Sequence, residues 1–194
     1  MPELWRDHGG HPQNGRMSTY LAFLRAINLG AKRVFPKDEI RRAVESVGFE
    51  DVATHINTGN VRFTTRMRSR GRIEDALERA FFENRGFPVP TIVFRADEFA
   101  DLAASARGLS ATRPDAARHY VYLLKDELPD DVIAQVEATS GPAGEMIVRG
   151  RAVHALLGPG YQNGTVDPLR AAKLLGVATN RNLTVVNALV DRWC

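Results

Sequence analysis

The sequence predicts an α+β protein made of two ferredoxin-like subdomains, each a split βαβ unit with an antiparallel sheet, followed by C-terminal helices. Three observations support this prediction. Residues 20–95 show strand and helix patterns in the order β-α-β-β-α-β, and a strand, a helix and a hairpin follow again between residues 119 and 157. Residues 180–193 then close the chain with a single apolar stripe. The two halves share this order of elements without a repeated sequence.

Each element of the first half has a local signal. Apolar runs predict strands at residues 20–27 and 91–95, and the alternation of residues 51–56 and 61–65 around a loop at 57–60 predicts a hairpin. In this register Ile56 faces Val61 and is buried. Apolar residues recurring at helical spacing predict helices over residues 36–49, 70–87 and 96–106.

The second half follows the same scheme. An apolar run predicts a strand at 119–125, and Pro129 with two following acids predicts the start of a helix over 129–138. A hairpin of residues 145–149 and 152–157 turns at Gly150 and Arg151. The rest of the chain reads as a loop at 158–164, a short helix over 167–176 and the final helix over 180–193.

The composition limits the class of protein. Of the 194 residues 44% are hydrophobic and 25% charged, which is typical of a chain that folds by itself. A net charge of +3 permits an anionic partner without requiring one. The single cysteine, Cys194, excludes an internal disulfide, and the chain has no apolar run of membrane-spanning length. We expect a cytoplasmic protein without a membrane partner.

The order of elements also suggests a division of the chain. We expect a disordered leader at residues 1–17, an N-terminal subdomain at 18–106 and a C-terminal subdomain with closing helices at 117–194. His8 and His11 lie in the leader without further ligands, so we expect no metal site there. Met17, which directly precedes the first strand, is a candidate functional start. The sequence has no P-loop, no Gly-x-Ser-x-Gly elbow, no His-Glu-x-x-His motif and no Cys/His ligand set, and we expect no cofactor.

Three short motifs resemble the DUF1697 family. The first is the stretch "LRAINLG" with Leu24, Arg25, Ile27, Asn28 and Gly30, and the second is "GNVRF" with Gly59, Asn60, Val61 and Phe63. The third is "TNRN" with Thr179, Arg181 and Asn182. The resemblance covers nearly all of residues 18–193 and implies an α+β protein of two related subdomains, in a family whose biochemical activity is not established.

The chain departs from the family pattern at several positions. Ala26 and Ala31 stand where the family usually has glycine, and Leu183 stands where it favours tryptophan. Gly164 and Thr165 replace a usual Ser-Lys pair, so any work that this pair does in other members is in question here.

Strand parity suggests a binding site. If the helices cover one face of the first sheet, Arg25, His55, Arg62 and Arg95 share the opposite face and line a groove between the subdomains, capped by the loops of Asn28 and Asn60. Because guanidinium groups form a fixed, charged fork, this groove is suited to a phosphate or a carboxylate. Motif residues Gly30, Arg181 and Asn182 complete the candidate ligand-binding set. The alternative is that Arg25 satisfies loop carbonyls and that the other arginines are solvated.

Other classes of function stay open. The closely spaced Arg66, Arg68, Arg70 and Arg72 could follow a nucleic-acid backbone or belong to a solvated loop, although the sheet lacks the aromatic pattern that stacks bases in the RNA-recognition fold. An enzyme would use His55 or His154 as acid or base, with no catalytic residue assigned. An interaction module could dimerise through a sheet edge, and the oligomeric state is left open.

Overall fold

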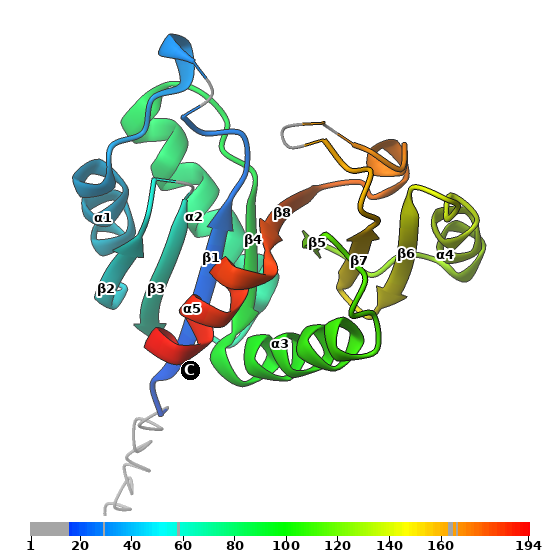
Figure 1. The fold of residues 1–194 in the computed structure, drawn as a ribbon. Coiled ribbons are helices and arrows are strands. Elements are labelled where there is room, and N and C mark those ends of the chain that lie inside the picture. The colour runs from blue at the N-terminus through cyan, green and yellow to red at the C-terminus, as the bar shows by residue number, and fades with distance from the viewer. Residues whose placement is uncertain (1–15, 29, 58, 163–164, 166) are drawn as a thin grey trace, which may run out of the picture.

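The protein is described here by a computed structural model, in which residues 16–28, 30–57, 59–162, 165 and 167–194 are placed (Figure 1). The α+β class is confirmed by two four-stranded antiparallel sheets. The expected leader lies outside the described residues except for Arg16 and Met17, and so do His8, His11 and Gly164.

The first sheet has the strand order of a ferredoxin-like fold. Its strands are arranged β2-β3-β1-β4, so that the first strand pairs with the third and the fourth. The elements are β1 (Ser18–Leu24), η1 (Ala31–Arg33), α1 (Lys37–Ser46), β2 (Glu50–His55), β3 (Asn60–Thr65), α2 (Arg70–Arg85) and β4 (Thr91–Arg95). Helices α1 and α2 cover one face, where Tyr20, Phe63 and Leu77 belong to one buried cluster. Burial of this apolar face is the main force that folds the half.

The second sheet repeats this arrangement. Its order is β6-β7-β5-β8, so β5 lies between β7 and β8 as β1 lies between β3 and β4. The elements are α3 (Ala96–Ala111), which joins the halves, then β5 (Arg118–Leu124), α4 (Asp130–Glu137), β6 (Gly144–Arg149), β7 (Ala152–Leu157), η2 (Ala172–Leu174), β8 (Ala178–Asn182) and α5 (Leu183–Trp193).

The C-terminal segment differs from the sequence prediction. The helix expected over 167–176 is reduced to the three-residue η2. Residues 180–182, which were expected to begin the last helix, belong instead to β8 (Ala178–Asn182). The polar run of β8 has no strand-like alternation of its own. It becomes a strand because its backbone pairs with β5, a long-range contact that local patterns do not reveal.

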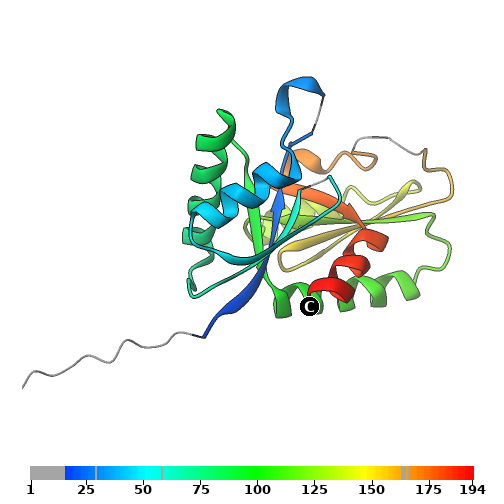
Figure 2. The same cartoon turned by 90° about the vertical axis from the view of Figure 1, so that its left-hand side faces the viewer.

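The remaining faces of the two sheets meet in the middle of the molecule. Leu21 and Phe23 of the first sheet share a buried cluster with Val121 and Leu123 of the second, together with apolar residues of α3 and α5. Figures 1 and 2 show α3 and α5 packed together beside the sheets, and α5 crosses over the first half. The face of the first sheet opposite its helices is therefore covered.

Charged side chains also join the halves. The guanidinium of Arg151, at the β6–β7 turn, donates to the backbone oxygen of Val93 at 3.0 Å and to Glu98 at 3.2 Å. Its charge also lies 4.0 Å from Glu74, whose pKa is raised mainly by burial. Lys125 donates to Glu78 at 2.6 Å. These contacts fix the second half against α2, β4 and α3. None of the described helices is both long and apolar enough to cross a bilayer.

Candidate functional site

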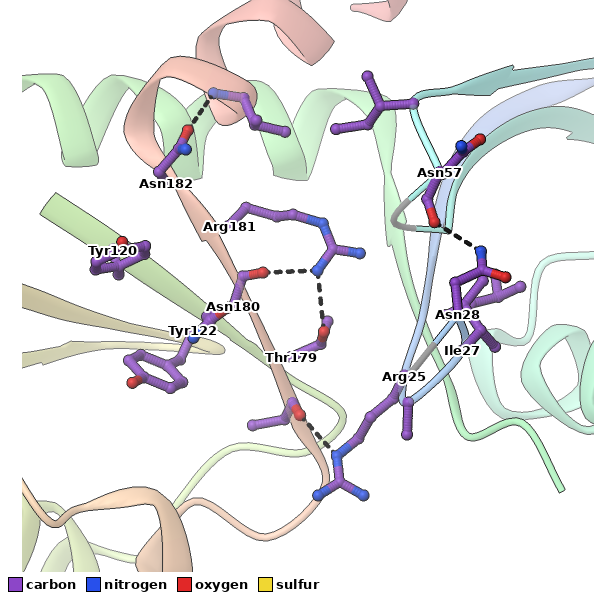
Figure 3. A pocket seen from close by; sticks show the side chains of 15 residues that line it. Arg25, Ile27, Asn28, Asn57, Tyr120, Tyr122, Thr179, Asn180, Arg181 and Asn182 are labelled. Atoms are coloured by element: carbon purple, nitrogen blue, oxygen red, sulfur yellow. Dashed lines mark hydrogen bonds between the residues drawn. The ribbon is translucent and has the colours of Figure 1, made fainter. Parts of the chain in front are cut away.

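A cavity of about 620 Å³ lies where the end of β1 faces β8 (Figure 3). Its lining comes from the loop after β1, the β2–β3 turn, strands β5 and β8, and the start of α5. The residues are Leu24, Arg25, Ala26, Ile27, Asn28, Ile56, Asn57, Tyr120, Tyr122, Ala178, Thr179, Asn180, Arg181, Asn182 and Val185. We call this cavity the groove.

The loop after β1 is shaped by its first motif. The strand ends at Leu24, and Ala26 and Asn28 both have positive φ angles, of 57° and 55°. A positive φ is easiest for glycine, so alanine at position 26 adopts this turn with some backbone strain. The Asn28 amide accepts a hydrogen bond from the Phe35 backbone at 2.8 Å and donates one to the Asn57 oxygen at 2.7 Å. Asn28 therefore ties two loops of the groove together.

The glycine of the second motif has a steric role. Gly59 has a φ of +75°, and a Cβ atom there would lie 2.7 Å from the Cβ of Leu24 and 2.9 Å from the Cδ1 of Ile27. Its carbonyl accepts a hydrogen bond from the Leu24 backbone at 2.8 Å. The β2–β3 turn can therefore lie this close to the β1 loop because residue 59 has no side chain. Gly30 also has a positive φ, of 69°, but it precedes η1 and does not line the groove.

Arg25 lies at the edge of the groove with its guanidinium exposed. Its Nε donates to the backbone oxygen of Ala178 at 2.9 Å, and this is the only side-chain hydrogen bond that it makes within the described part of the chain. The contact links the β1 loop to β8 across the groove. In Figure 3 no dashed line reaches its two terminal nitrogens.

Arg181 and Asn60 join the second and third motifs directly. The Arg181 Nε donates to the Asn60 Oδ1 at 2.6 Å, and its Nη1 donates to Thr179 Oγ1 at 3.0 Å and to the Asn180 oxygen at 2.6 Å. The guanidinium lies 5.6 Å from the ring centre of Phe23. Arg181 is only 7% exposed, and burial lowers its pKa to about 10, so it keeps its charge near neutral pH. The pair links the halves beneath the groove.

Strand β8 ends at the groove, and α5 begins directly after it. Asn182 is the N-cap of α5, and its side-chain oxygen accepts a hydrogen bond from the Val185 backbone at 2.8 Å. On the neighbouring strand, Tyr120 and Tyr122 pair with Asn182 and Asn180. A second cavity, of about 270 Å³, shares Tyr120, Tyr122 and Asn180 with the groove and continues it toward Tyr161 and Asp167.

The hairpin register differs from the expected one, and two of the predicted residues lie away from the groove. β3 begins at Asn60, so that Thr54 pairs with Val61 and His55 with Asn60. His55 and Arg62 do share a face, but His55 contacts the ring of Trp193 on α5, and Arg62 donates to the Asp51 oxygen at 3.3 Å. The pKa of His55 is lowered, mainly by burial. The expectation that Ile56 is buried is wrong, since it lies in the turn and is 38% exposed.

Arg95 is placed at the far end of the sheet. Ile92 and Phe94 face the second half, so the parity argument puts Arg95 on the side of α1 and α2, opposite to the expected one. It pairs with Tyr20, near the start of β1, whereas Arg25 follows the end of that strand. Its guanidinium is bound to Asp97 at 2.8 Å.

Some side chains of the arginine-rich segment, residues 66–72, form hydrogen bonds with other parts of the fold. Arg70 donates to the Lys125 oxygen at 2.8 Å and to Asp126 at 3.3 Å, so it connects the halves. Arg68 donates to the Arg16 oxygen at 3.5 Å, and the side chains of Arg66 and Arg72 are exposed. None of these four arginines is among the residues that line the groove.

His154 lies in the core and forms a pair with His119. The Nε2 of His119 and the Nδ1 of His154 are 3.1 Å apart on the inner face of the second sheet. Burial lowers the pKa of both to about 4. Neither histidine lines the groove. Among the described residues, no group of three or more His, Cys, Asp or Glu side chains is placed to hold a metal ion.

The sequence prediction missed the tyrosine side of the groove. Tyr120, Tyr122 and Asn180 carry no motif, although the spacing of two residues between the tyrosines puts both on one face of a strand. This signal is ambiguous without knowing which face is covered. Asn57 was expected only as a loop residue.

Comparisons with known proteins give a family and a fold. The sequence profile of a family described as "Protein of unknown function (DUF1697)" matches residues 17–154, which include the β1 loop and the β2–β3 hairpin. The solved structure of the conserved bacterial protein SP0830 from Streptococcus pneumoniae is similar, with a TM-score of 0.71 and 23% identity over 91% of this chain and 98% of that one. No protein of curated function matches the chain.

Proposed function

This chain belongs to the DUF1697 family of proteins of unknown function, and from that premise we propose that it binds a small anionic ligand in the groove between its two sheets. One observation carries the proposal. Among the described residues that line the groove there are two arginines, Arg25 and Arg181, and no aspartate or glutamate. A cavity lined in this way has a positive potential, which favours a phosphate or a carboxylate.

The two arginines contribute in different ways. Arg25 is exposed and offers its terminal nitrogens to a ligand, with its orientation set by the bond to the Ala178 oxygen. Arg181 is buried and held by neutral oxygen atoms of Asn60, Thr179 and Asn180, so its charge acts on the groove from below. A guanidinium held in place loses little conformational entropy when an anion binds.

The start of α5 adds to this potential. The first turn of α5, like that of α2, contains no acidic residue, whereas α1, α3 and α4 begin with acidic residues. The partial positive charge of the helix start is therefore not neutralised locally, and Asn182 and Val185 bring it to the groove. The partial charge of the helix start adds to the charge of the two arginines, and the helix start is not a binding site by itself.

The size and the apolar part of the lining favour a small molecule. Small-molecule sites enclose about 300–1,000 Å³ and combine apolar walls with a few placed polar groups. The groove encloses about 620 Å³ and has Leu24, Ile27 and Val185 among its walls.

A thermal-shift screen with phosphorylated and carboxylated metabolites tests the proposal. A ligand at one hundred times its Kd stabilises the folded state by about 2.7 kcal/mol, which raises Tm by roughly 5–10 °C for a chain of this size. The variant Arg25→Gln removes one charge-assisted contact, so we expect it to weaken the binding of a hit by about 10- to 100-fold. Arg62→Gln is the matched control. Because Arg62 lies outside the groove, this variant should bind the hit as tightly as the wild type does.

The proposal fails if no compound of either class raises Tm. It also fails if Arg25→Gln binds a hit as tightly as the wild type does.

A further inference from the structure

We infer that the anion bound in the groove carries a flat ring, joined to the charged group through a linker of several bonds, as in a nucleoside monophosphate. The inference rests on the proposed function and names its ligand class. It comes from the side of the groove opposite Arg25, where two tyrosines and two asparagines lie together.

These four side chains form two cross-strand pairs. Tyr120 on β5 pairs with Asn182 on β8, and Tyr122 pairs with Asn180. Because residues two apart on a strand point to the same side, all four belong to one face of the sheet. Tyrosine rings stack on flat rings, and asparagine side chains form hydrogen bonds with ring edges, as they do with adenine. The Asn182 side-chain oxygen already caps α5, so its side-chain nitrogen is the group that can donate to a ring. We call these four side chains the platform. The platform therefore offers both stacking and hydrogen bonding, the two kinds of contact that a nucleobase needs.

The platform is accessible. Tyr120 and Tyr122 are only partly buried, and both line the groove as well as the second cavity. The hydroxyl of Tyr120 lies 3.4 Å from that of Tyr161, so a further aromatic ring lines the second cavity. The two spaces, of about 620 and 270 Å³, meet over these rings and leave room for a ligand larger than an inorganic anion.

The position of Arg25 defines the linker. In Figure 3 the tyrosines lie on one side of β8 and Arg25 on the other, so a ligand that contacts both must cross the strand. β8 is the edge strand beside β5, so a ring over the tyrosines of β5 lies at least one strand spacing, about 4.8 Å, from a group beyond β8. A carboxylate bonded directly to a ring is too short for this crossing. A phosphate joined to a base through a sugar has the required length.

Calorimetric titration with two matched probes tests the inference. Adenosine 5′-monophosphate and ribose 5-phosphate carry the same phosphate and sugar, and only the first has a base. Stacking of one base on aromatic side chains should make the nucleotide bind about 5- to 100-fold more tightly to the wild type. A 5′-phosphorylated oligonucleotide is the third probe, and if it binds more tightly than the mononucleotide, the ring comes from a nucleic-acid end.

Variants assign the two parts of the ligand. Tyr122→Leu should lower the affinity for the nucleotide to that for ribose 5-phosphate, whereas Tyr122→Phe keeps the ring and should bind as the wild type does. Arg25→Gln should weaken both probes by the same factor. Circular dichroism checks that each variant is folded, and the comparison of probes on the wild type does not depend on any variant.

The outcomes separate the ring from the anion site. Equal affinities for the two phosphates on the wild type, reduced together by Arg25→Gln, would overturn the ring and leave the anion site intact. If neither phosphate binds, the ring inference is overturned, and the metabolite screen decides the anion site independently.

Discussion

The two halves of the molecule have the same strand order, but the helix-bearing faces of their sheets are covered differently. In the first half the chain between β3 and β4 forms α2, a helix of 16 residues, and Tyr20 of the central strand is buried beneath it at 2% exposure. In the second half the described part of the connection between β7 and β8 contains only η2, of three residues, and Tyr120 stays partly exposed. Tyr20 and Tyr120 are each the third residue of the central strand.

This difference shows how one topology can give a core in one half and a binding surface in the other. Leu169, Ala171 and Leu175 near η2 still pack against the second sheet, so its core is closed over β6 and β7. Without a full helix the cover does not extend to the tyrosines of β5 at the groove. The candidate site therefore lies where the repeat is incomplete.

The strongest test of this comparison uses one substitution on each face. Leu77→Ala removes a fully buried side chain of α2 and should lower the free energy of unfolding by about 2–5 kcal/mol, because a cavity is left behind. Tyr122→Ala, on the partly exposed face, should lower it by about 1–2 kcal/mol, since part of the tyrosine surface stays in water. Urea denaturation measures both values. Equal losses would show that the tyrosine face is as closely packed as the face under α2.

The turns of the two central hairpins provide a second comparison. Gly59 and Gly150 both have positive φ angles, but a Cβ atom at Gly59 meets Leu24 and Ile27, whereas one at Gly150 meets nothing within 4 Å. Gly150→Ala should cost about 1–2 kcal/mol from backbone strain alone. Gly59→Ala should cost roughly 2–4 kcal/mol, because close packing adds to the strain. Thermal unfolding measures the difference, and equal Tm losses would mean that the β1 loop moves aside without cost.

The third comparison concerns pH. Burial lowers the pKa of His119 and His154 to about 4, below the ordinary value of 6.5, so the unfolded chain binds more protons between these two values. Their contribution to stability is therefore complete above pH 6.5 and is lost as the pH falls toward 4. We expect a loss of about 2 kcal/mol per imidazole between pH 7 and pH 5. The first half has Arg62 at the place of His154, so the effect is predicted for the second half.

Urea denaturation at both pH values, with His154→Leu as the comparison, measures this loss. The variant should lose less stability than the wild type between pH 7 and pH 5. A wild type whose stability does not change over this range would contradict the burial of the pair.

Much of the fold could be predicted from local sequence. The strands 91–95 and 152–157 have the bounds that their apolar runs indicate, and Gly86 ends α2 in the left-handed conformation that a helix C-cap favours. β8 could not be predicted in this way, because its polar residues are held in the sheet by pairing with β5. The hairpin register was misjudged because asparagine suits a turn, whereas Asn60 is the first residue of β3.

The candidate site was predicted in part. Its motif residues Arg25, Asn28, Arg181 and Asn182 line the groove, whereas His55, Arg62 and Arg95 lie elsewhere. Strand parity tells which residues share a face, but it does not tell which face the second half covers or where along the strand a cavity lies. Arg95 illustrates this limit, since it is at the opposite end of the sheet from Arg25.

The sequence by itself determined the α+β class, the order of most elements and the motifs that meet at the groove, because apolar periodicity and turn residues act over a few neighbouring positions. Only the tertiary structure decided that Arg181 reaches Asn60 across 121 positions of chain, and that Tyr120 and Tyr122 are left partly uncovered. The first depends on how the two sheets pack together with α3 and α5, and the second on the short connection between β7 and β8. That packing is set by the burial of apolar surface from distant segments, and no local stretch of sequence contains it.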